Sequence, residues 1–429
     1  MRILTVTTLY PNAEAQNHGV FVENRLRQLL KSGLVEATVV APVPWFPFGA
    51  GVFGRYGQMA RIPVVEKRHG VPVSHPRYAL IPKLGMSLTP LLLYFALRRH
   101  VRRTLNNGEG FDLIDAHYVY PDGVAAAWLG AKLGKPVVVT ARGTDLHLIS
   151  HYRIPRLLIR NAFKRCAAVV TVSQALARCA HALGPQNLRV EVLRNGVDLD
   201  LFRERERTEV RNELNLSGPT LISVGLLIPR KGHELIIEAL SRLPDAQLLI
   251  CGEGPMRNQL ERYAERWGVS GRVKFLGQIT HGELSRYYSA ADVLVLASLR
   301  EGWPNVLLEA MACGTPVVAN AVGAVPEFVG HPHAGRILRE RTGPAIAEAV
   351  RAILDNPPSR QDVRKYASQF SWTETSQGLL ALFSDIIAAH GGTKSKLPQK
   401  NGKRIDVSET ASTSRKSRDR NSDNHRVHD

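Results

Sequence analysis

Short runs of apolar, mostly β-branched residues alternate with helix-like segments along most of the chain, and this alternation starts again halfway. The runs are 3–8, 38–42, 112–116, 136–140, 168–172 and 189–193 in the first half, and 220–225, 246–252, 272–277, 292–298 and 315–320 in the second. Apolar runs joined by helices are typical of parallel strands whose two faces are both covered. The sequence therefore predicts an α/β protein with two doubly wound Rossmann-like domains that face a cleft.

A charge-rich stretch, residues 194–218, interrupts the alternation and marks the expected crossing between the domains. We predict a first domain over residues 1–200 and a second over residues 201–372. A last helix over residues 373–390 would pack back on the first domain. Residues 391–429 hold ten Lys or Arg, five Asp or Glu and no aromatic residue, so they cannot bury enough apolar surface to offset the entropy lost on ordering. A disordered basic tail is expected there.

The excess of basic residues limits the kinds of binding partner that the protein is expected to have. The chain has 56 Lys or Arg against 38 Asp or Glu, a net charge of +18, and residues 1–110 carry fourteen against five, a net of +9. A basic first domain implies an anionic partner, which is a nucleic acid, a phosphorylated substrate or an anionic membrane. The sequence holds no recognised nucleic-acid-binding module, so no specific nucleic acid is expected, although a basic nucleic-acid-binding protein stays an alternative.

Several features concern localisation. Four scattered cysteines without a CxxC pair, an amino terminus unlike a signal peptide and the absence of an apolar run of ~18 residues predict a cytoplasmic protein. Residues 88–105 combine apolar residues with arginines as in an amphipathic basic helix, which can lie on an anionic leaflet. Peripheral attachment to the inner membrane face is therefore a hypothesis. The alternative is a solvated helix whose apolar face packs in the core.

The segment 298–319, SLREGWPNVLLEAMACGTPVVA, carries the clearest functional pattern. It follows a predicted strand, and its loop contains Glu301 and Gly302, a residue type that lets the backbone approach a ligand closely. A helix is expected to begin at about Asn305. The first amides of a helix lack partners within the helix and attract anions.

The amides of Asn305, Val306 and Leu307 therefore form an expected phosphate site. Glu309 lies one turn inside the same helix, and Glu301 precedes it. A carboxylate can accept hydrogen bonds from two neighbouring hydroxyls, as found on ribose or hexose. The alternative is that these glutamates only balance the helix dipole.

The spacing Glu301-x7-Glu309 within EGWPNVLLEAMACGTPVVA closely resembles the motif of glycosyltransferase family 4, whose members are retaining, use nucleotide sugars and fold as two Rossmann domains. The similarity extends from about Thr5 to about Phe370. It implies a glycosyltransferase of the hexosyltransferase type that acts in polysaccharide assembly. By this resemblance Glu309 binds the nucleotide ribose and Glu301 binds hydroxyls of the donor sugar. The first domain would then lie on the acceptor side, and the second would bind the donor.

The segment at 223–240, SVGLLIPRKGHELIIEAL, resembles the strand, loop and helix that follow the domain crossing in this family. The resemblance implies that Lys231 pairs with the donor diphosphate, and Arg230 is a second candidate. Leu226 stands where many members have an arginine. One phosphate contact is therefore either missing or supplied by Arg230.

Three further positions follow from the resemblance. Gly277 and Gln278 lie in RVKFLGQIT, which is similar to the segment whose backbone contacts the nucleotide base. Gly19 resembles a glycine whose amide faces the donor phosphate or the acceptor. The segment NAVGAVPEFV at 320–329 resembles one near the sugar, but Ala324 replaces its second glycine.

Polar residues also follow two predicted strands of the first domain. His117 lies just past one strand, and family members often have a histidine there, near the reacting sugar. Its physical use would be that of a neutral hydrogen-bond partner or a local base. Arg142 and Asp145 follow the next strand, and Asp145 is a candidate for binding a substrate hydroxyl. The alternatives are a structural histidine and a structural loop aspartate.

No cofactor and no metal are expected. Asp198 and Asp200 form a DxD pattern, but they follow a turn at the domain crossing, where the family has a structural segment. The predicted partners are a nucleotide diphospho-sugar donor, which is a substrate, and a glycan or lipid-linked acceptor. The predicted function is sugar transfer in cell-surface polysaccharide or glycolipid synthesis. A nucleotide-sugar epimerase or a phosphorylase of the same fold is the alternative enzyme.

Overall fold

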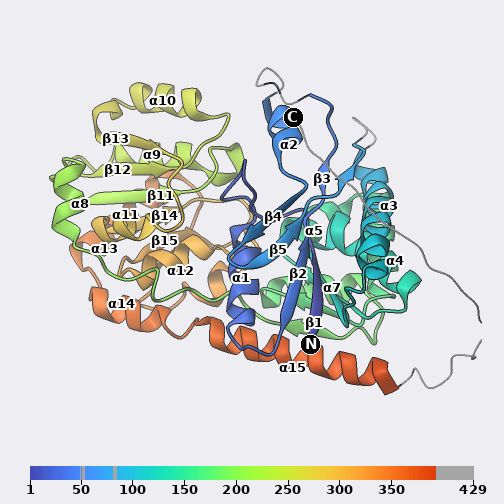
Figure 1. The fold of residues 1–429 in the computed structure, drawn as a ribbon. Coiled ribbons are helices and arrows are strands. Elements are labelled where there is room, and N and C mark those ends of the chain that lie inside the picture. The colour runs from blue at the N-terminus through green and yellow to red at the C-terminus, as the bar shows by residue number, and fades with distance from the viewer. Residues whose placement is uncertain (49, 51–53, 81–84, 393–429) are drawn as a thin grey trace, which may run out of the picture. The chain divides into compact units, whose positions relative to one another are not determined.

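A computed structural model describes residues 1–48, 50, 54–80 and 85–392 (Figure 1). Met1–Gly391 forms one compact unit that contains two large sheets. The predicted tail at 391–429 lies outside the described residues from residue 393 onward. The boundaries proposed for the two domains stay a prediction.

The first sheet has the strand order β10-β9-β8-β7-β1-β2-β5-β4, and only β4 and β5 pair in antiparallel fashion. In the described residues its strands are β1 (Arg2–Val6), β2 (Glu36–Val40), β4 (Val65–Arg68), β5 (Val71–Ser74), β7 (Leu113–His117), β8 (Val137–Ala141), β9 (Ala168–Thr171) and β10 (Val190–Val192). Strands β7 and β8 are buried along their whole length, as uninterrupted apolar runs predict.

Helices cover both faces of this sheet. They are α1 (Val20–Leu30), α3 (Gly85–Asn106), α4 (Val124–Leu133), α5 (Thr144–His147), α6 (Arg153–Phe163) and α7 (Gln174–Leu183). Side chains alternate between the faces of a strand. Leu4 and Val6 of β1 accordingly share a core with α3, α4 and α6, whereas Ile3 shares another with α1.

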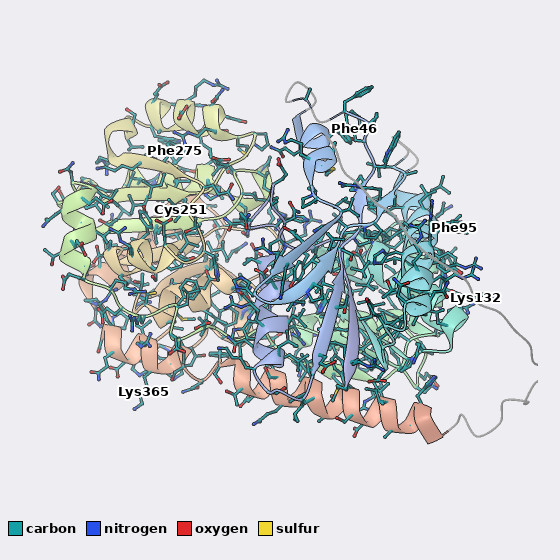
Figure 2. All side chains as sticks on the ribbon, viewed as in Figure 1. Phe46, Phe95, Lys132, Cys251, Phe275 and Lys365 are labelled. Carbon is teal, nitrogen blue, oxygen red and sulfur yellow. The ribbon has the colours of Figure 1, made fainter. Side chains whose placement is uncertain are left out.

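The second sheet is parallel throughout, with the order β13-β12-β11-β14-β15-β16. In the described residues its strands are β11 (Thr220–Val224), β12 (Gln247–Cys251), β13 (Val273–Gly277), β14 (Val293–Leu296), β15 (Val317–Asn320) and β16 (Gly335–Leu338). Cys251 lies at the end of β12, among packed side chains (Figure 2). The prediction of two doubly wound sheets is thus confirmed.

Helices also enclose the second sheet. One face packs against α9 (His233–Leu240), α10 (Arg257–Arg266) and α13 (Gly343–Asp355). The other face packs against α11 (Leu284–Ala290), α12 (Asn305–Ala312) and α14 (Arg360–Ala367). A further helix, α8 (Arg207–Glu213), contacts α11.

The last described helix, α15 (Trp372–Gly392), returns to the first sheet (Figure 1). Its apolar residues Leu379, Leu382, Phe383 and Ile386 lie in the same core as Ile3. Counted from Leu379, they lie at positions i, i+3, i+4 and i+7, which share one face of the helix.

The stretch 43–85, which the sequence left unassigned, contains β3 (Val43–Pro44), α2 (Gly54–Arg61), β4, β5 and β6 (Arg77–Tyr78) among its described residues. Strand β16 and helix α14 are also additions to the predicted elements. Strand β16 has a glycine and an arginine in its four residues and shows no clear apolar alternation, whereas α14 is a short helix whose apolar residues Val363, Tyr366 and Ala367 share one face.

Candidate active site

Helix α12 begins directly after the loop that follows β14. Pro304 is its N-cap residue, and no side chain caps the helix. Among the described residues, the amides of Asn305 and Val306 donate no hydrogen bond. The Leu307 amide, in contrast, donates to the Pro304 carbonyl at 3.1 Å. The prediction that these amides are free is therefore wrong for Leu307, because the first turn is tight enough for its amide to donate within the turn.

Lys231 and Glu301 form an ion pair. The Lys231 Nζ lies 2.6 Å from the Glu301 Oε1, and the two side chains are 14% and 10% exposed. Lys231 ends a short 3-10 turn, Pro229–Lys231. Gly232 follows it with a φ of 73° and caps α9. A Cβ on Gly232 would lie 2.3 Å from the Ala297 carbonyl oxygen, so glycine permits the contact that brings Lys231 to the loop after β14.

Glu309 lies on α12 and is 7% exposed. Its Oε1 lies 3.1 Å from the His281 Nε2, and its Oε2 accepts a hydrogen bond of 3.0 Å from the Tyr288 hydroxyl. Burial, together with the negative charge of Glu309, raises the pKa of Tyr288 well above its usual value. The phenol therefore stays a donor. Glu301 and Glu309 thus belong to two separate hydrogen-bonded groups.

His117, at the end of β7, is buried with both ring nitrogens occupied. Its Nε2 lies 2.9 Å from an Asp115 oxygen, and its Nδ1 lies 2.6 Å from the Arg142 Nη2. Because a guanidinium only donates, Nδ1 accepts and Nε2–H donates to Asp115. Burial lowers the pKa of His117 to about 4, despite the neighbouring Asp115. The imidazole is therefore neutral at physiological pH.

Asp145, at the start of α5, has no exposed surface. Its oxygens accept hydrogen bonds from the backbone amides of Val119, Arg142, Gly143 and Leu146. Burial raises the pKa of this carboxyl, and the amide hydrogen bonds oppose that shift. This arrangement favours the structural alternative, in which Asp145 shapes the loop between β8 and α5.

The loop after β8 meets the loop before α12. A Cβ on Gly302 would lie 2.0 Å from the Arg142 carbonyl oxygen. The side of Gly302 on which a side chain would lie therefore faces the backbone of Arg142. Close approach of a ligand to Gly302 stays a prediction. Arg142 Nη1 also donates to the Asn195 side chain at 3.1 Å, and Asn195 Nδ2 donates to the Asn305 Oδ1 at 3.3 Å. Arg142 and the start of α12 are thus linked through Asn195.

Of the remaining predicted site residues, three contact the protein backbone and the fourth is exposed. Gly19 caps α1 with a φ of 70°, and a Cβ there would lie 2.3 Å from the Leu9 carbonyl. Gly277 ends β13, and its carbonyl accepts the Gly252 amide at 2.7 Å. Gln278 is exposed. Arg230 Nη1 donates to the Arg300 carbonyl at 2.9 Å.

The segment at 320–329 also contributes. A Cβ on Gly323 would lie 1.8 Å from the Glu301 carbonyl oxygen, so this glycine lets two loops pack. Glu327 accepts the Ala175 amide at 3.2 Å and an Arg194 nitrogen at 3.0 Å. The glycine and the glutamate of this segment therefore hold backbone and side chains of the protein itself.

Sequence reasoning missed His281, Tyr288, Asn195 and Asp115. His281, Tyr288 and Asn195 are far in sequence from the residues they contact, so no spacing signal points to them. Asp115, in contrast, lies only two positions from His117 in β7, and this spacing could have indicated it. Among the described residues, no group of three or more His, Cys, Asp or Glu side chains could hold a metal ion. Asp198 accepts the amides of Asp200 and Leu201 in a turn. Metal independence stays a prediction.

Two doubly wound sheets, with a lysine–glutamate pair and an uncapped helix start after strands of the second, fit a glycosyltransferase of the two-Rossmann-domain (GT-B) type. A model described as Glycosyltransferase Family 4 matches residues 18–201, and one described as Glycosyl transferases group 1 matches residues 204–370. The chain is therefore a glycosyltransferase, and its residues 18–201 match family 4.

Relatives with curated names agree with this assignment. TuaC of Bacillus subtilis (strain 168), named as a glycosyltransferase of teichuronic acid biosynthesis, is 29% identical over 362 residues, which cover 82% of this chain and 88% of TuaC. The D-inositol 3-phosphate glycosyltransferase of Mycolicibacterium smegmatis is 34% identical over 206 residues, or 46% of this chain and 47% of that one. The second match thus spans about half of its relative.

Solved structures show the same fold. Sucrose-phosphate synthase from Thermosynechococcus elongatus has a TM-score of 0.74 at 22% identity and covers 91% of this chain and 100% of its own. Anabaena HepE in complex with UDP and glucose has a TM-score of 0.69 at 22% identity, with 90% of this chain and 100% of HepE covered. At this level of identity the likeness concerns the fold alone.

Proposed function

We propose that the protein is a retaining glycosyltransferase that moves a sugar from a nucleotide diphospho-sugar to a glycan or lipid-linked acceptor, in cell-surface polysaccharide or glycolipid synthesis. The observation that carries this proposal is the Lys231–Glu301 ion pair at 2.6 Å. It joins a cation suited to a diphosphate with a carboxylate suited to sugar hydroxyls. The name of TuaC supports the acceptor class, and the UDP and UDP-glucose complexes of HepE support a nucleotide-sugar donor.

The chemistry requires charge stabilisation more than a covalent nucleophile. When the bond between the anomeric carbon and the diphosphate breaks, negative charge grows on the leaving oxygen. Lys231 and the amides of Asn305 and Val306 would stabilise that charge without a metal ion. A leaving-phosphate oxygen would take the proton of the acceptor hydroxyl, whose oxygen bonds to the anomeric carbon on the same face. The configuration would then be retained.

The proposal is tested first by ligand binding. The purified full chain is heated with UDP, GDP, ADP, CDP and dTDP and with their common sugars, because a ligand at a hundred times its Kd stabilises the folded state by about 2.7 kcal/mol. One base should dominate. The best donor is then incubated with candidate acceptors, and the anomeric configuration of the product is determined by NMR. Isomerisation of the donor alone would instead indicate an epimerase, and cleavage by inorganic phosphate a phosphorylase.

A matched pair of variants tests the site. Glu309→Ala should lose about ten- to 150-fold in kcat/KM for the donor, because a lost hydrogen bond to a charged group costs ~1.5–3 kcal/mol. Glu348→Ala is the control, since Glu348 is exposed on α13. Equal kcat/KM for the two folded variants would reject the assignment of Glu309.

Peripheral attachment to an anionic membrane is the second part of the proposal. The structure gives α3 two apolar faces. Leu93, Leu97 and Val101 are buried in the core, whereas Leu91 and Phe95 are 42% and 53% exposed. The core alternative explains only the first face. Figure 2 shows Phe95 on the side of α3 away from the strands.

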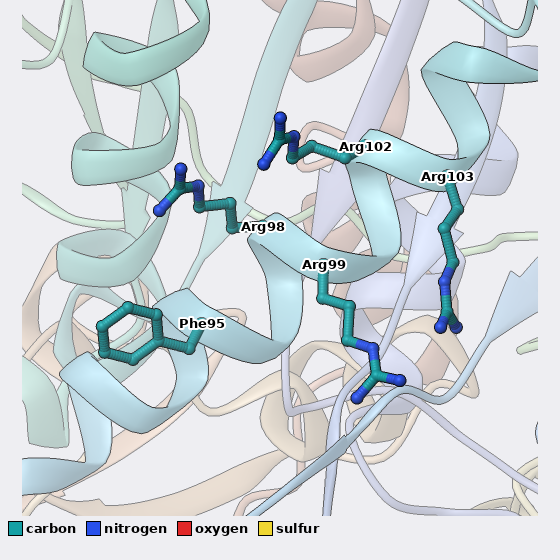
Figure 3. A pocket seen from close by; sticks show the side chains of 5 residues that line it. All are labelled: Phe95, Arg98, Arg99, Arg102 and Arg103. Atoms are coloured by element: carbon teal, nitrogen blue, oxygen red, sulfur yellow. The ribbon is translucent and has the colours of Figure 1, made fainter.

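Arginines continue the exposed face of α3. Arg98, Arg99, Arg102 and Arg103 follow Phe95 within two turns (Figure 3). Such a change from apolar to cationic side chains along one helix matches the acyl and headgroup layers of an anionic leaflet. No helix in the described part of the chain has both the length and the apolar character needed to cross a bilayer.

Helix α6 extends this surface. Its Ile154 and Leu157 are 51% and 65% exposed, and exposed arginines flank them at 153, 156 and 160. Trp128 of α4 connects the two helices: its ring lies 6.1 Å from that of Tyr94 on α3, and its Nε1 donates to Asn161 of α6 at 3.3 Å. We therefore take α3 and α6 together as the proposed lipid-facing surface.

Vesicle flotation tests this surface. The double variant Arg99→Gln/Arg102→Gln should bind phosphatidylglycerol vesicles about thirtyfold more weakly than the wild type, because each basic residue near an anionic surface contributes ~1 kcal/mol. The double variant Arg262→Gln/Arg266→Gln, on α10 of the second sheet, removes equal charge and should bind normally. Indifference of the wild type to anionic lipid and to salt would reject the hypothesis.

A further inference from the structure

The surroundings of Glu309 contain two polar residues whose roles the proposed transfer does not define. His281 lies in the loop between β13 and α11, and Tyr288 lies on α11. One bonds the Glu309 Oε1 at 3.1 Å and the other bonds the Oε2 at 3.0 Å. The carboxylate is therefore held from two sides before any ligand arrives.

The number of remaining acceptor sites is informative. An ionised carboxylate has about four lone-pair sites, two on each oxygen. His281 and Tyr288 each occupy one, on different oxygens. One site is left on each oxygen of Glu309, which is the arrangement that two neighbouring hydroxyls require. Fixing the carboxylate in advance also removes the entropy cost of ordering it on binding.

A buried aromatic ring supports both donors. Phe202 is 1% exposed, and its ring centroid lies 4.9 Å from that of His281, edge to face, and 6.1 Å from that of Tyr288. Its amide donates to the Asp198 carbonyl at 2.8 Å, within the crossing between the two sheets. The orientation of both donors is therefore set by packing as well as by hydrogen bonding.

The electrostatic surroundings favour a charged His281. Burial lowers its pKa, but the charge and hydrogen bond of Glu309 outweigh burial and raise the pKa overall. Asp198 raises it further, and Arg27 of α1 opposes that effect. When His281 is protonated, its Nε2–H donates a charge-assisted hydrogen bond to the Glu309 Oε1.

We propose that His281 and Tyr288 are positioning residues that fix the Glu309 carboxylate for the vicinal hydroxyls of the nucleotide ribose. The inference rests on the proposed function and on the predicted binding of the nucleotide ribose by Glu309. His281 also follows the predicted base-binding residues Gly277 and Gln278 by only a few positions. The loop that contacts the base would therefore also set the geometry for the ribose.

Calorimetric titration of the full chain separates this role from a structural one. The probes are UDP, GDP and ADP, their 2′,3′-dideoxy analogues, and inorganic pyrophosphate. The wild type should prefer the best nucleotide over its dideoxy analogue by about tenfold or more. His281→Ala and Tyr288→Phe should reduce that preference to about threefold or less and leave pyrophosphate affinity unchanged.

Kinetics and conservative variants complete the test. His281→Ala should raise the donor KM by about tenfold and change kcat by less than about threefold, since the ribose is bound equally in the ground and transition states. His281→Gln, which keeps a donor, should recover most of the affinity. Tyr287→Phe is the matched control beside Tyr288, and it should behave as the wild type does.

The outcomes are distinguishable. If the wild type shows no preference for the ribose hydroxyls, the ribose role of Glu309 itself fails. If the wild type discriminates and folded His281→Ala and Tyr288→Phe do so equally well, only the present inference is overturned. Because His281 is partly exposed, with 19% of its side chain accessible, its variants carry the test even if Tyr288→Phe does not fold.

Discussion

The ion pair between Lys231 and Glu301 predicts that replacing one member or the other has opposite effects on nucleoside diphosphate affinity. The pair is close, at 2.6 Å, and both side chains are less than 15% exposed, so water screens it weakly. In the absence of a donor, Lys231 is therefore shared with Glu301. A nucleoside diphosphate must compete with Glu301 for this cation.

We expect Lys231→Met to weaken nucleoside diphosphate binding by about ten- to 150-fold, because a hydrogen bond to a charged group contributes ~1.5–3 kcal/mol. The unpaired Glu301 would add repulsion toward the diphosphate. Glu301→Gln should instead bind the same nucleotide as tightly as the wild type or more tightly, because Lys231 is released. The same variant should lose at least about tenfold in sugar transfer, since Gln cannot replace a charged acceptor for the sugar hydroxyls.

The assay combines calorimetric titration of UDP, GDP and ADP with the transfer rate from the preferred donor. The double variant Lys231→Met/Glu301→Gln should recover about threefold or more of the nucleotide affinity lost in Lys231→Met, since the repulsion is removed. Thermal denaturation establishes that each variant is folded. A Glu301→Gln variant with nucleotide affinity as weak as that of Lys231→Met would refute the reasoning, because Glu301 would then support the diphosphate rather than compete with it.

Two further predictions concern the loops around the site. Gly302→Ala should lower the transfer rate about a hundredfold, because its Cβ would lie 2.0 Å from the Arg142 carbonyl oxygen and would displace the loop. A displacement of about 1 Å in an active site has an effect of that size. A loss below threefold would contradict the prediction. Asp122 is buried, and burial raises its pKa to about 8, compared with ~3.9 in an unfolded chain. The contribution of the protonated carboxyl to the stability of the fold is therefore complete below pH ~4 and falls as the pH rises toward 8. Urea unfolding at pH 5.5 and 7.5 should therefore show the wild type losing roughly 2–3 kcal/mol of unfolding free energy relative to Asp122→Asn, and parallel pH dependence would exclude the shift.

The apolar runs predicted the two sheets because a strand that is buried on both faces can be identified from its own sequence, without knowledge of the strands that it pairs with. The strands β7, β8 and β11 are each buried throughout, and all three were predicted from their sequence alone. Strand β16, with the sequence GRIL, has no such run and became a strand through its pairing with β15. Its existence depends on tertiary context that a local pattern does not contain.

The predicted parallel strands also indicated which polar residues lie at strand ends. They did not indicate which loops contact one another. Glycine at 302 indicated a close approach, and the structure identifies the Arg142 carbonyl as the group that approaches. Arg142 and Gly302 are 160 positions apart, and only the packing of the loops relates them. The partners of Glu309 were missed for the same reason, since nothing in the spacing of His281 and Tyr288 marks them as its donors.

The pairing of Glu301 with Lys231 has a consequence for the order of events in turnover. A complete donor would supply both a diphosphate for Lys231 and hydroxyls for Glu301, so neither charge stays unpaired when their ion pair separates. A product nucleoside diphosphate supplies only the first, and it leaves Glu301 without a partner in a site that is largely shielded from water. Reformation of the Lys231–Glu301 pair would then favour product release. The same contact would thus make the site selective for the intact donor over the nucleotide it leaves behind.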